Sequence, residues 1–283
     1  MIDYYLITKP GIILGNLLTF AAGFILGTYG HFNLAVFFAA LSGIGLVIAS
    51  ACIFNNYIDR FRDQKMERTK KRALAAGTIS NQTALIYGSI LAFLGSGILL
   101  LFTNELTLAI TAGGFFIYVL LYSLLKGQTV LGTAIGSIAG AVPPVAGYTA
   151  ASGTLDTAAW LLFALLVLWQ MPHFYSIALL YLEDYKRAGI PVLPAKKGVF
   201  RTKVHMALYI CLLLPTALLL SYWGYTGLIF LGSVLFFGTA WFTLCLYGFS
   251  IEDTHSWSRQ MFRLSLILIC ALCLSIPLDR IFP

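Results

Sequence analysis

The sequence predicts an all-α integral membrane protein, and three observations carry this prediction. Of its 283 residues, 59% are apolar and only 10% are charged, and the mean hydropathy is +0.87. A soluble domain carries about 25% charged residues. Apolar stretches of about 20 residues, the length that crosses a bilayer, recur along the whole chain. The Lys and Arg residues gather in a few short segments between those stretches. A water-soluble globule is therefore excluded.

Nine apolar spans are expected, within a single domain over residues 1–283. They cover residues 11–30, 34–55, 84–103, 106–124, 129–150, 157–181, 205–222, 227–248 and 262–279. Each should be an α-helix, because backbone groups without internal hydrogen bonds cannot face hydrocarbon. Glycines at positions 132, 136 and 140 form a small-residue face that allows close helix packing. Pro143 and Pro144 should kink the fifth span near its outer end.

The distribution of basic residues predicts the orientation in the membrane. Segment 56–83 holds seven Lys or Arg residues and segment 182–204 holds six. Together with Lys9, Lys126, Arg259 and Arg263, they place every basic residue except Arg280 on one side. By the positive-inside rule this side is cytoplasmic, so the N-terminus faces the cytoplasm and the C-terminus the exterior of the inner (plasma) membrane. The net charge of +7 thus follows from the membrane topology, and the expected partner is membrane lipid and no nucleic acid.

A polar stripe is expected at the end of the second span. Asn55, Asp59 and Asp63 recur every four residues, so on a helix they share one face. Their oxygens are hard ligands of the kind that bind Mg²⁺ together with substrate phosphates. Neighbouring basic side chains can bind a diphosphate directly: Arg62, Lys65, Arg68, Lys71 and Arg72. A charged loop that only enforces topology would not explain Asn55 and Asp59 at a span end, where polar groups are costly.

A second group of candidates runs from Trp169 to Pro194. His173 and Asp184 are eleven residues apart, so a single helix would put both on one face, about 16 Å apart. Pro172 can kink such a helix, and Lys186 beside Asp184 is expected to be a substrate-binding cation. A histidine within a membrane span is a functional candidate by default. The alternative is a neutral imidazole paired with a polar side chain of a neighbouring helix.

A third group lies at the inner end of the fourth span: Tyr118, Tyr122, Ser123 and Lys126. The two tyrosines share a helix face and could line a cavity. Their alternative role is that of interfacial belt residues, with the lysine as a snorkelling anchor.

Three segments together resemble one known family. They are NNYIDRxxDxKMERT, then YSLLKxxT followed by GSIAGAVPPVAGY, and WQMPHFYSIALLYLEDYKRAGIPVLP. They are similar to the protohaem IX farnesyltransferases of the UbiA superfamily of intramembrane prenyltransferases, over roughly residues 5–280. The NxxxDxxxD spacing alone indicates the superfamily, whereas WQMPHF with EDY…GIPVLP is specific to the haem enzymes.

The resemblance implies nine helices around a central cavity, with two acidic motifs on the cytoplasmic side. It implies that Asn55, Asp59 and Asp63 form the first catalytic and Mg²⁺-binding motif, and that Asp184 belongs to the second. Such enzymes join farnesyl diphosphate to a vinyl group of haem b. The product, haem O, would be passed to a haem A synthase or a terminal oxidase. His173 becomes a candidate for orienting haem, as an iron ligand or as a partner of a propionate.

The chain departs from the pattern of that family at three places. Phe61 stands where many relatives have an aspartate, so we expect no metal role there. Adjacent Glu183 and Asp184 replace two spaced aspartates of the wider superfamily. Gly127 stands where a basic residue is expected after Lys126.

Two other functions fit part of the sequence. One is another UbiA-type aromatic prenyltransferase that acts on a quinone precursor or a chlorophyll-type acceptor, although WQMPHF argues against it. The other is a secondary transporter, for which broken helices and intramembrane polar residues are equally natural. The acidic stripe beside a cationic cluster favours diphosphate chemistry over transport.

Overall fold

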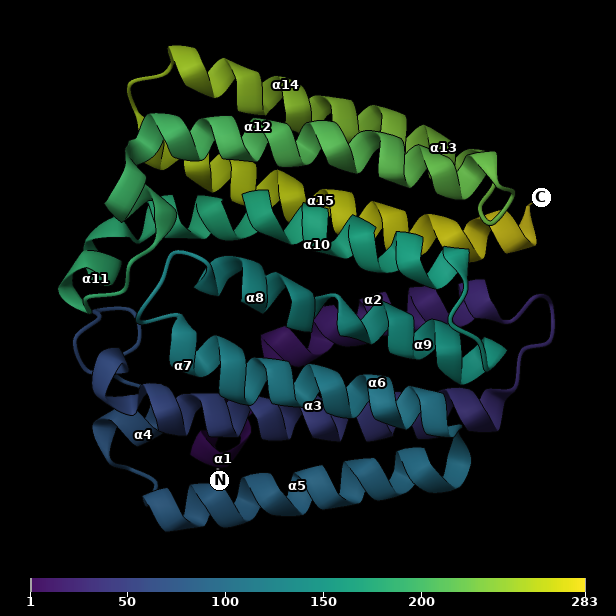
Figure 1. Ribbon diagram of the computed structural model, residues 1–283, viewed down its shortest axis with the longest axis horizontal. Helices are drawn as coiled ribbons and strands as arrows, with labels where there is room; N and C mark the ends of the chain where they lie inside the picture. The colour runs from purple at the N-terminus through teal and green to yellow at the C-terminus, as the bar shows by residue number, and fades with distance from the viewer. Residues whose placement is uncertain (1, 283) are drawn as a thin grey trace.

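Long apolar helices make up most of the chain (Figure 1). The computed structural model describes residues 2–282, and within them eight helical segments are long and apolar enough to cross a membrane. No strand occurs in these residues, so the all-α prediction is confirmed. The segments are α2 (Pro10–Gly27), α3 (Leu34–Asp63), α5 (Asn81–Phe102), α6 to α7 (Glu105–Leu125), α10 (Thr157–Leu180), α12 (Leu193–Tyr222), α13 to η3 (Leu228–Ser250) and α15 (Thr254–Ile281).

Two of these segments are composite, and five short helices lie outside the eight segments, among them the pair α8 (Gly132–Gly140) and α9 (Val142–Ser152). The first composite is α6 (Glu105–Phe116), the π-helix η1 (Ile117–Tyr122) and α7 (Ser123–Leu125). The second is α13 (Leu228–Ser233), the π-helix η2 (Val234–Gly238), α14 (Thr239–Tyr247) and the 3₁₀-helix η3 (Gly248–Ser250). The other three short helices are α1 (Ile2–Leu6), α4 (Ala73–Ala76) and α11 (Leu182–Arg187).

Side-chain caps begin many of the long helices. Asn33, Asn104 and Asp156 accept hydrogen bonds from the first free N–H groups of α3, α6 and α10. Ser80 and Asp253 do the same for α5 and α15. These groups have no intrahelical partner, so each cap stabilises its helix by about 1 kcal/mol.

The expected span 129–150 is a pair of short helices. They are α8 (Gly132–Gly140) and α9 (Val142–Ser152), which join at Ala141. Pro143 and Pro144 lie in the first turn of α9, where a proline removes no needed hydrogen bond. From the sequence, the kink is expected near the outer end of the span. The break falls instead near the middle of the span, at Ala141. Within residues 2–282 the α8–α9 pair thus lies where the fifth of the nine spans is expected, beside the eight long segments.

The packing of α8 confirms the prediction from the glycine spacing. A Cβ atom at Gly140 would overlap the side-chain amide of Gln170 on α10. A Cβ atom at Gly136 would lie 2.9 Å from the ring of Tyr122 in η1. Both glycines are therefore needed for the close approach of these helices.

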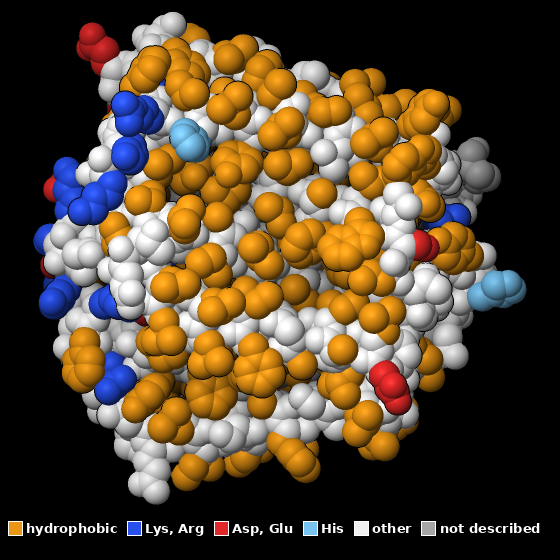
Figure 2. Space-filling view, viewed as in Figure 1, with side chains coloured by type: hydrophobic (Ala, Val, Ile, Leu, Met, Phe, Trp, Pro, Cys, Tyr) orange, Lys and Arg blue, Asp and Glu red, His pale blue; other side chains and the backbone are white. Residues whose placement is uncertain are grey.

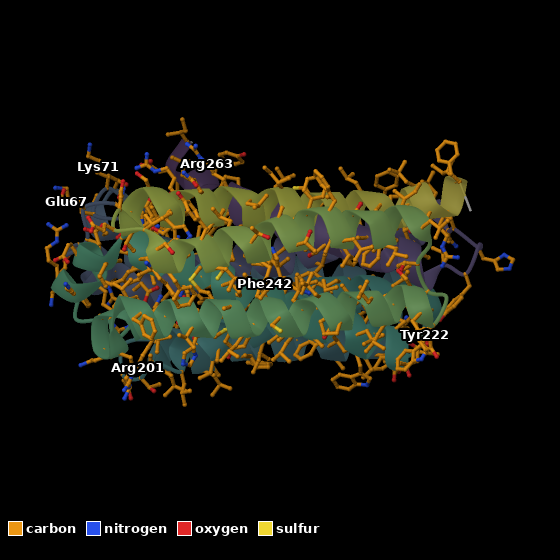
Figure 3. The ribbon with its side chains drawn as sticks, turned by 90° about the horizontal axis from the view of Figure 1, so that it is seen from above. Glu67, Lys71, Arg201, Tyr222, Phe242 and Arg263 are labelled. Carbon is orange, nitrogen blue, oxygen red and sulfur yellow. The ribbon has the colours of Figure 1, made fainter. Side chains whose placement is uncertain are left out.

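The two ends of the bundle differ in charge. The loop that contains α4 and the loop that contains α11 lie at the same end, where Figure 2 shows most of the Lys and Arg side chains. We call it the basic end. Seen from above, Glu67, Lys71 and Arg201 lie at this end and Tyr222 at the other (Figure 3). Large apolar side chains such as Phe93 and Leu101 are exposed along the sides between the two ends, at 80% and 76%. The chain is therefore a multi-pass membrane protein.

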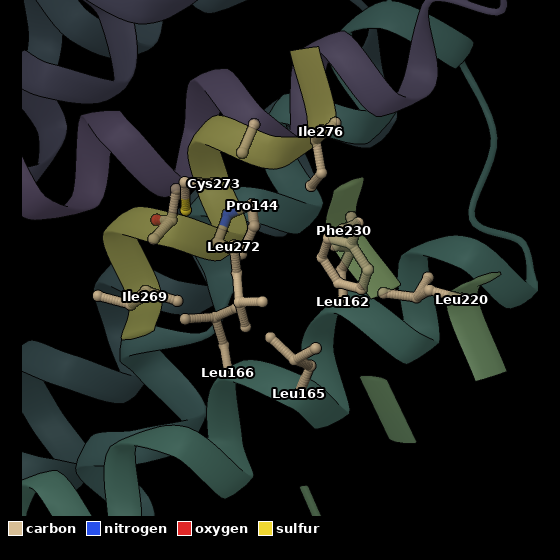
Figure 4. Close-up of a pocket in the computed structure, with 12 residues that line it drawn as sticks. Pro144, Leu162, Leu165, Leu166, Leu220, Phe230, Ile269, Leu272, Cys273 and Ile276 are labelled. Atoms are coloured by element: carbon tan, nitrogen blue, oxygen red, sulfur yellow. The ribbon is translucent and has the colours of Figure 1, made fainter. Parts of the chain in front are cut away.

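A small apolar cavity lies inside the bundle, away from the basic end. It is lined by residues such as Leu162 and Leu166 of α10, Phe230 of α13 and Leu272 of α15 (Figure 4). Its volume of about 20 Å³ is room for about one water molecule. A prenyl chain or a porphyrin does not fit there.

Candidate active site

The polar stripe occupies the last turns of α3. The second span was expected to end at residue 55, but α3 continues as a helix to Asp63. Asn55, Asp59 and Asp63 therefore share one face, and each is at most 3% exposed. Phe61 does not share this buried face, because it is 63% exposed. This agrees with the expectation that it has no metal role.

Cationic side chains from α3 itself and from other segments face this stripe. The Lys126 ammonium contacts the Asp59 carboxylate, and Arg62 Nη1 lies 3.7 Å from the other oxygen of Asp59. Arg72 Nη1 donates to both oxygens of Asp63, at 3.2 and 3.0 Å. Such charge-assisted contacts are the kind that a diphosphate would make with the same cations.

Lys9 is a site residue that the sequence analysis did not single out. Its Nζ donates to Asn55 Oδ1 at 2.6 Å, and Asn55 Nδ2 donates to Ser123 Oγ at 2.9 Å. Lys9 directly precedes Pro10, the first residue of α2, and has a left-handed backbone conformation with φ of 56°. Burial lowers the pKa of Lys9 to about 8. The one signal in the sequence was Pro10, because a proline at the first helical position places the preceding residue at the helix entrance.

The third group of candidates joins the same site. The rings of Tyr118 and Tyr122 stack with centroids 5.2 Å apart, and both residues belong to the π-helix η1. Lys126 Nζ lies 5.0 Å from the Tyr122 ring centroid. Short π-helices are frequent at functional sites because they re-aim side chains. Here η1 and α7 together direct Tyr122, Ser123 and Lys126 toward the stripe.

The second acidic group lies on a helix of its own. The helix α10 runs through Pro172 without a break and ends at Leu180, because Tyr181 leaves the helical conformation (φ −116°, ψ 31°). The expectation that His173 and Asp184 share one continuous helix face is therefore wrong. Asp184 lies on α11 and is 7% exposed.

Asp184 binds the loop that follows the polar stripe. It accepts hydrogen bonds from the backbone N–H groups of Glu67 and Arg68, at 3.3 and 3.2 Å, and pairs with Arg187. Burial acts to raise the pKa of Asp184, but the hydrogen bonds from Arg68, Arg187 and Glu67 outweigh it and hold the pKa below its usual value. The two acidic motifs are thus connected through this loop. A role of Asp184 as a metal ligand stays a prediction.

Three predicted substrate-binding lysines lie apart from the stripe. Lys65 and Lys71 are exposed, and their ammonium groups make no hydrogen bond or ion pair within residues 2–282. Lys186 is also exposed and pairs with Glu183 at 2.8 Å.

The stripe fits a divalent cation, although no group of three His, Cys, Asp or Glu side chains is assembled for one within residues 2–282. Oδ1 of Asp59 is buried and has no hydrogen-bond partner in that part of the chain. Asp59 and Asp63 lie one turn apart and offer hard oxygens, as Mg²⁺ requires. Asn55 Oδ1, now bonded to Lys9, is a third oxygen on the same face.

His173 lies deeper in the bundle, between two aromatic rings. Its imidazole stacks on Trp169 and on Phe262 of α15, with centroids 4.8 and 5.0 Å away. Its Nδ1 lies 2.7 Å from Ser265 Oγ, which itself donates to the Phe262 carbonyl at 2.6 Å. Because the serine proton is used in this way, Nδ1–H is the donor to Ser265, and Nε2 carries the lone pair. Within residues 2–282, Nε2 has no hydrogen-bond partner. The alternative role expected for this histidine was a hydrogen bond to a polar side chain of a neighbouring helix. That hydrogen bond is present, from Nδ1 to Ser265, but it leaves Nε2 without a partner within residues 2–282.

Comparison with known proteins identifies the family. The model of the UbiA prenyltransferase family matches residues 16–267. The chain belongs to the UbiA prenyltransferase family. Curated relatives within this family are similar over nearly their full length. The Protoheme IX farnesyltransferase of Protochlamydia amoebophila is 49% identical over 282 residues, covering 99% of this chain and 100% of the relative. The enzyme of the same name from Citrobacter koseri is 43% identical, covering 99% and 95%.

Solved structures of UbiA prenyltransferases and their relatives share the fold. A digeranylgeranylglyceryl phosphate synthase superimposes with a TM-score of 0.82 at 16% identity, covering 99% of this chain and 98% of the other. A UbiA homologue from Archaeoglobus fulgidus bound to GPP and Mg²⁺ superimposes with a TM-score of 0.66 at 19% identity, covering 97% and 99%. At these identities the likeness concerns the fold alone.

Proposed function

We propose that this chain transfers the farnesyl group of farnesyl diphosphate to a vinyl group of haem b, giving haem O and diphosphate. The observation that carries the proposal is the full-length identity of 43–49% to relatives named Protoheme IX farnesyltransferase. At the basic end, the polar stripe offers carboxylates for a metal ion, and the cations that face it can bind the phosphate oxygens of the diphosphate.

The diphosphate is proposed to bind along the stripe, with Mg²⁺ as the cofactor. Asp59 and Asp63 would hold the ion, with Asn55 and Asp184 as the remaining predicted ligands. The UbiA homologue bound to GPP and Mg²⁺ supports a divalent cation as the cofactor. When the donor binds, Lys9, Arg62, Arg72 and Lys126 would exchange side-chain oxygens for phosphate oxygens at similar distances.

In the proposed reaction, the bond between C1 of the farnesyl chain and the diphosphate oxygen breaks, and its electron pair leaves with the diphosphate. The surrounding lysines and arginines stabilise this developing negative charge, and a bound Mg²⁺ would add Lewis-acid stabilisation. The π-electrons of the haem vinyl group form a new C–C bond with the allylic farnesyl cation. Water then adds to the cation beside the ring and releases a proton, which leaves a hydroxyethylfarnesyl group. No activated protein nucleophile is required.

We assign His173 to haem b as an iron ligand. The hydrogen bond from Nδ1–H to Ser265 fixes the tautomer, and this arrangement is common among histidines that bind metals through Nε2. Stacking on Trp169 and Phe262 fixes the plane of the ring. Because Nδ1 is engaged by Ser265, Nε2 is the ring nitrogen left to bind iron.

The basic end is proposed to face the cytoplasm, with the N-terminus inside and the C-terminus outside the inner membrane. The positive-inside rule supports this orientation. It gives the stripe access to a water-soluble diphosphate head group, while the farnesyl chain stays among apolar helices and lipid. A haem A synthase or a terminal oxidase would take up the product.

The test is release of diphosphate by the purified protein in lipid nanodiscs. Release should require farnesyl diphosphate, haem b and Mg²⁺ together, and EDTA should abolish it. Release with a quinone precursor in place of haem b would favour the alternative aromatic prenyltransferase. Uptake of a solute into vesicles without diphosphate release would favour a transporter.

A further inference from the structure

A second cavity opens at the basic end, beside the loop that joins the two acidic motifs. Its volume is about 690 Å³, which lies in the usual range of pockets for small molecules. Leu179, Leu180 and Val199 make its wall partly apolar, and Arg68 and His255 add polar groups from the loop and from α15. It opens at the end of the helices, beside α11 and the start of α15.

The acidic side chains of this cavity are all neutralised by neighbours. Glu67 pairs with Lys70, Glu183 with Lys186 and Asp184 with Arg187. These ion pairs reduce the negative charge that the lining presents to a carboxylate. The lining is therefore less acidic than its composition indicates.

Arg68 is the cation of the cavity that lacks an acidic partner. Its guanidinium lies over the ring of Tyr181, 4.9 Å from the centroid, and makes no ion pair or side-chain hydrogen bond within residues 2–282. Stacking occupies the face of the guanidinium and leaves its N–H donors free around the edge. The arrangement holds a planar fork of donors ready for a carboxylate.

We propose that this cavity binds the propionate side of haem b, with Arg68 and His255 as the partners of the two carboxylates. A porphyrin with an apolar vinyl edge and two carboxylates matches a partly apolar pocket with donors at the end of the helices. The inference rests on the proposed function and names the site of its second substrate. It also moves Arg68 from the diphosphate, where the sequence analysis placed it, to haem.

The position of the cavity agrees with the role given to His173. Leu179 is six residues after His173 on α10, a rise of about 9 Å along the helix. On α15, His255 lies at the start of the helix, and Phe262 farther along the same helix stacks on His173. Haem with its propionates in the cavity would extend between α10 and α15 toward the imidazole.

The loop after α3 forms the wall between the two substrates. Its Arg72 faces Asp63 in the stripe, while its Arg68 lines the cavity. The hydrogen bonds from Glu67 and Arg68 to Asp184 hold this wall in place. A haem vinyl group could thus approach the donor without sharing its cations.

The experiment compares the KM values of both substrates for the protein in nanodiscs. Arg68→Gln and His255→Gln should each raise the KM for haem b, by about tenfold or more for Arg68→Gln because a charge-assisted hydrogen bond is lost. The KM for farnesyl diphosphate should stay within about twofold, and Arg68→Lys should restore part of the loss. Arg201→Gln is the matched control: it removes one exposed charge at the same end, outside the cavity lining, and should change neither KM.

Haem b dimethyl ester provides the second arm. Wild-type protein should bind the ester more weakly than haem b, and in Arg68→Gln the preference for haem b should shrink to the part that His255 contributes, in titrations that follow the Soret band. A raised KM for farnesyl diphosphate with an unchanged KM for haem b would overturn the inference. So would equal losses with haem b and the ester that vary with the anionic lipid content, because Arg68 would then bind lipid phosphate. If the wild-type protein binds haem b in this way but forms no haem O, the proposed function fails and the cavity assignment stands.

Discussion

Single residues of the acidic stripe could be predicted from the sequence, but their partners could not. A spacing of four residues is a local property, so it placed Asn55, Asp59 and Asp63 on one face of α3 correctly. Lys9 lies 46 residues from Asn55, and Lys126 lies 67 residues from Asp59. Contacts at such separations depend on how the helices pack, and a single sequence contains no local signal of that packing.

The variants Asp59→Asn and Asp63→Asn test the stripe. Each keeps the size of the side chain but removes one negative charge next to the proposed ion. We expect turnover to fall roughly 100-fold or more, as the loss of about 3 kcal/mol of charge stabilisation would cause. Diphosphate release at limiting Mg²⁺ measures the effect, and a melting curve shows whether the variant is folded. Near-normal turnover at limiting Mg²⁺ would remove that residue from the ligand set.

Lys9→Met tests the residue that only the structure revealed. The change deletes one charge-assisted hydrogen bond to the diphosphate, so the KM for farnesyl diphosphate should rise about tenfold. Lys9→Arg keeps the charge and should lose less. Lys197→Met, an exposed lysine at the same end, serves as the control. An unchanged KM in Lys9→Met would show that Lys9 only positions Asn55.

At the scale of elements, charge and hydropathy located the helices but not their ends. The drop in hydropathy after residue 55 did not end α3, because backbone hydrogen bonds continue wherever side chains permit them. Conversely, α10 ends at Leu180, although nothing in the residue type of Tyr181 forbids a helix there. The break lets α11 turn Asp184 onto the loop after α3, a tertiary contact without a local pattern.

The pairing of α10 with α15 carries the assignment of His173. His173→Ala should weaken binding of haem b and shift its Soret band, while binding of farnesyl diphosphate with Mg²⁺ stays nearly unchanged. Ser265→Ala keeps the imidazole and removes the partner of Nδ1, so its effect on affinity should be smaller. Parallel titrations of both substrates measure these effects. An altered affinity with the same Soret band would indicate contact with a propionate, and a lower melting temperature alone would indicate packing.

For the whole molecule, composition was sufficient to predict the membrane fold and the grouping of charge at one end. The hydropathy of the spans and the charge of each end are averages over many residues. A wrong interpretation of one position therefore changes neither prediction. The central break of the α8–α9 pair and the cavity beside Arg68 depend on particular contacts and were not foreseen.

The orientation can be measured with reporters. A reporter fused after residue 70 or residue 195 should be cytoplasmic, and one fused after residue 283 should be external. An external reporter after residue 70 would place the stripe on the wrong side of the membrane for a cytoplasmic diphosphate.

Mass spectrometry of haem extracted from cells with and without this protein decides whether the chain makes haem O. Cells that contain it should accumulate a haem heavier than haem b by one farnesyl group plus one hydroxyl group. Cells that express the Asp59→Asn variant at the same level should contain haem b alone. If the protein is present and folded yet haem b remains unmodified, or if a different acceptor carries the prenyl group, the account is wrong.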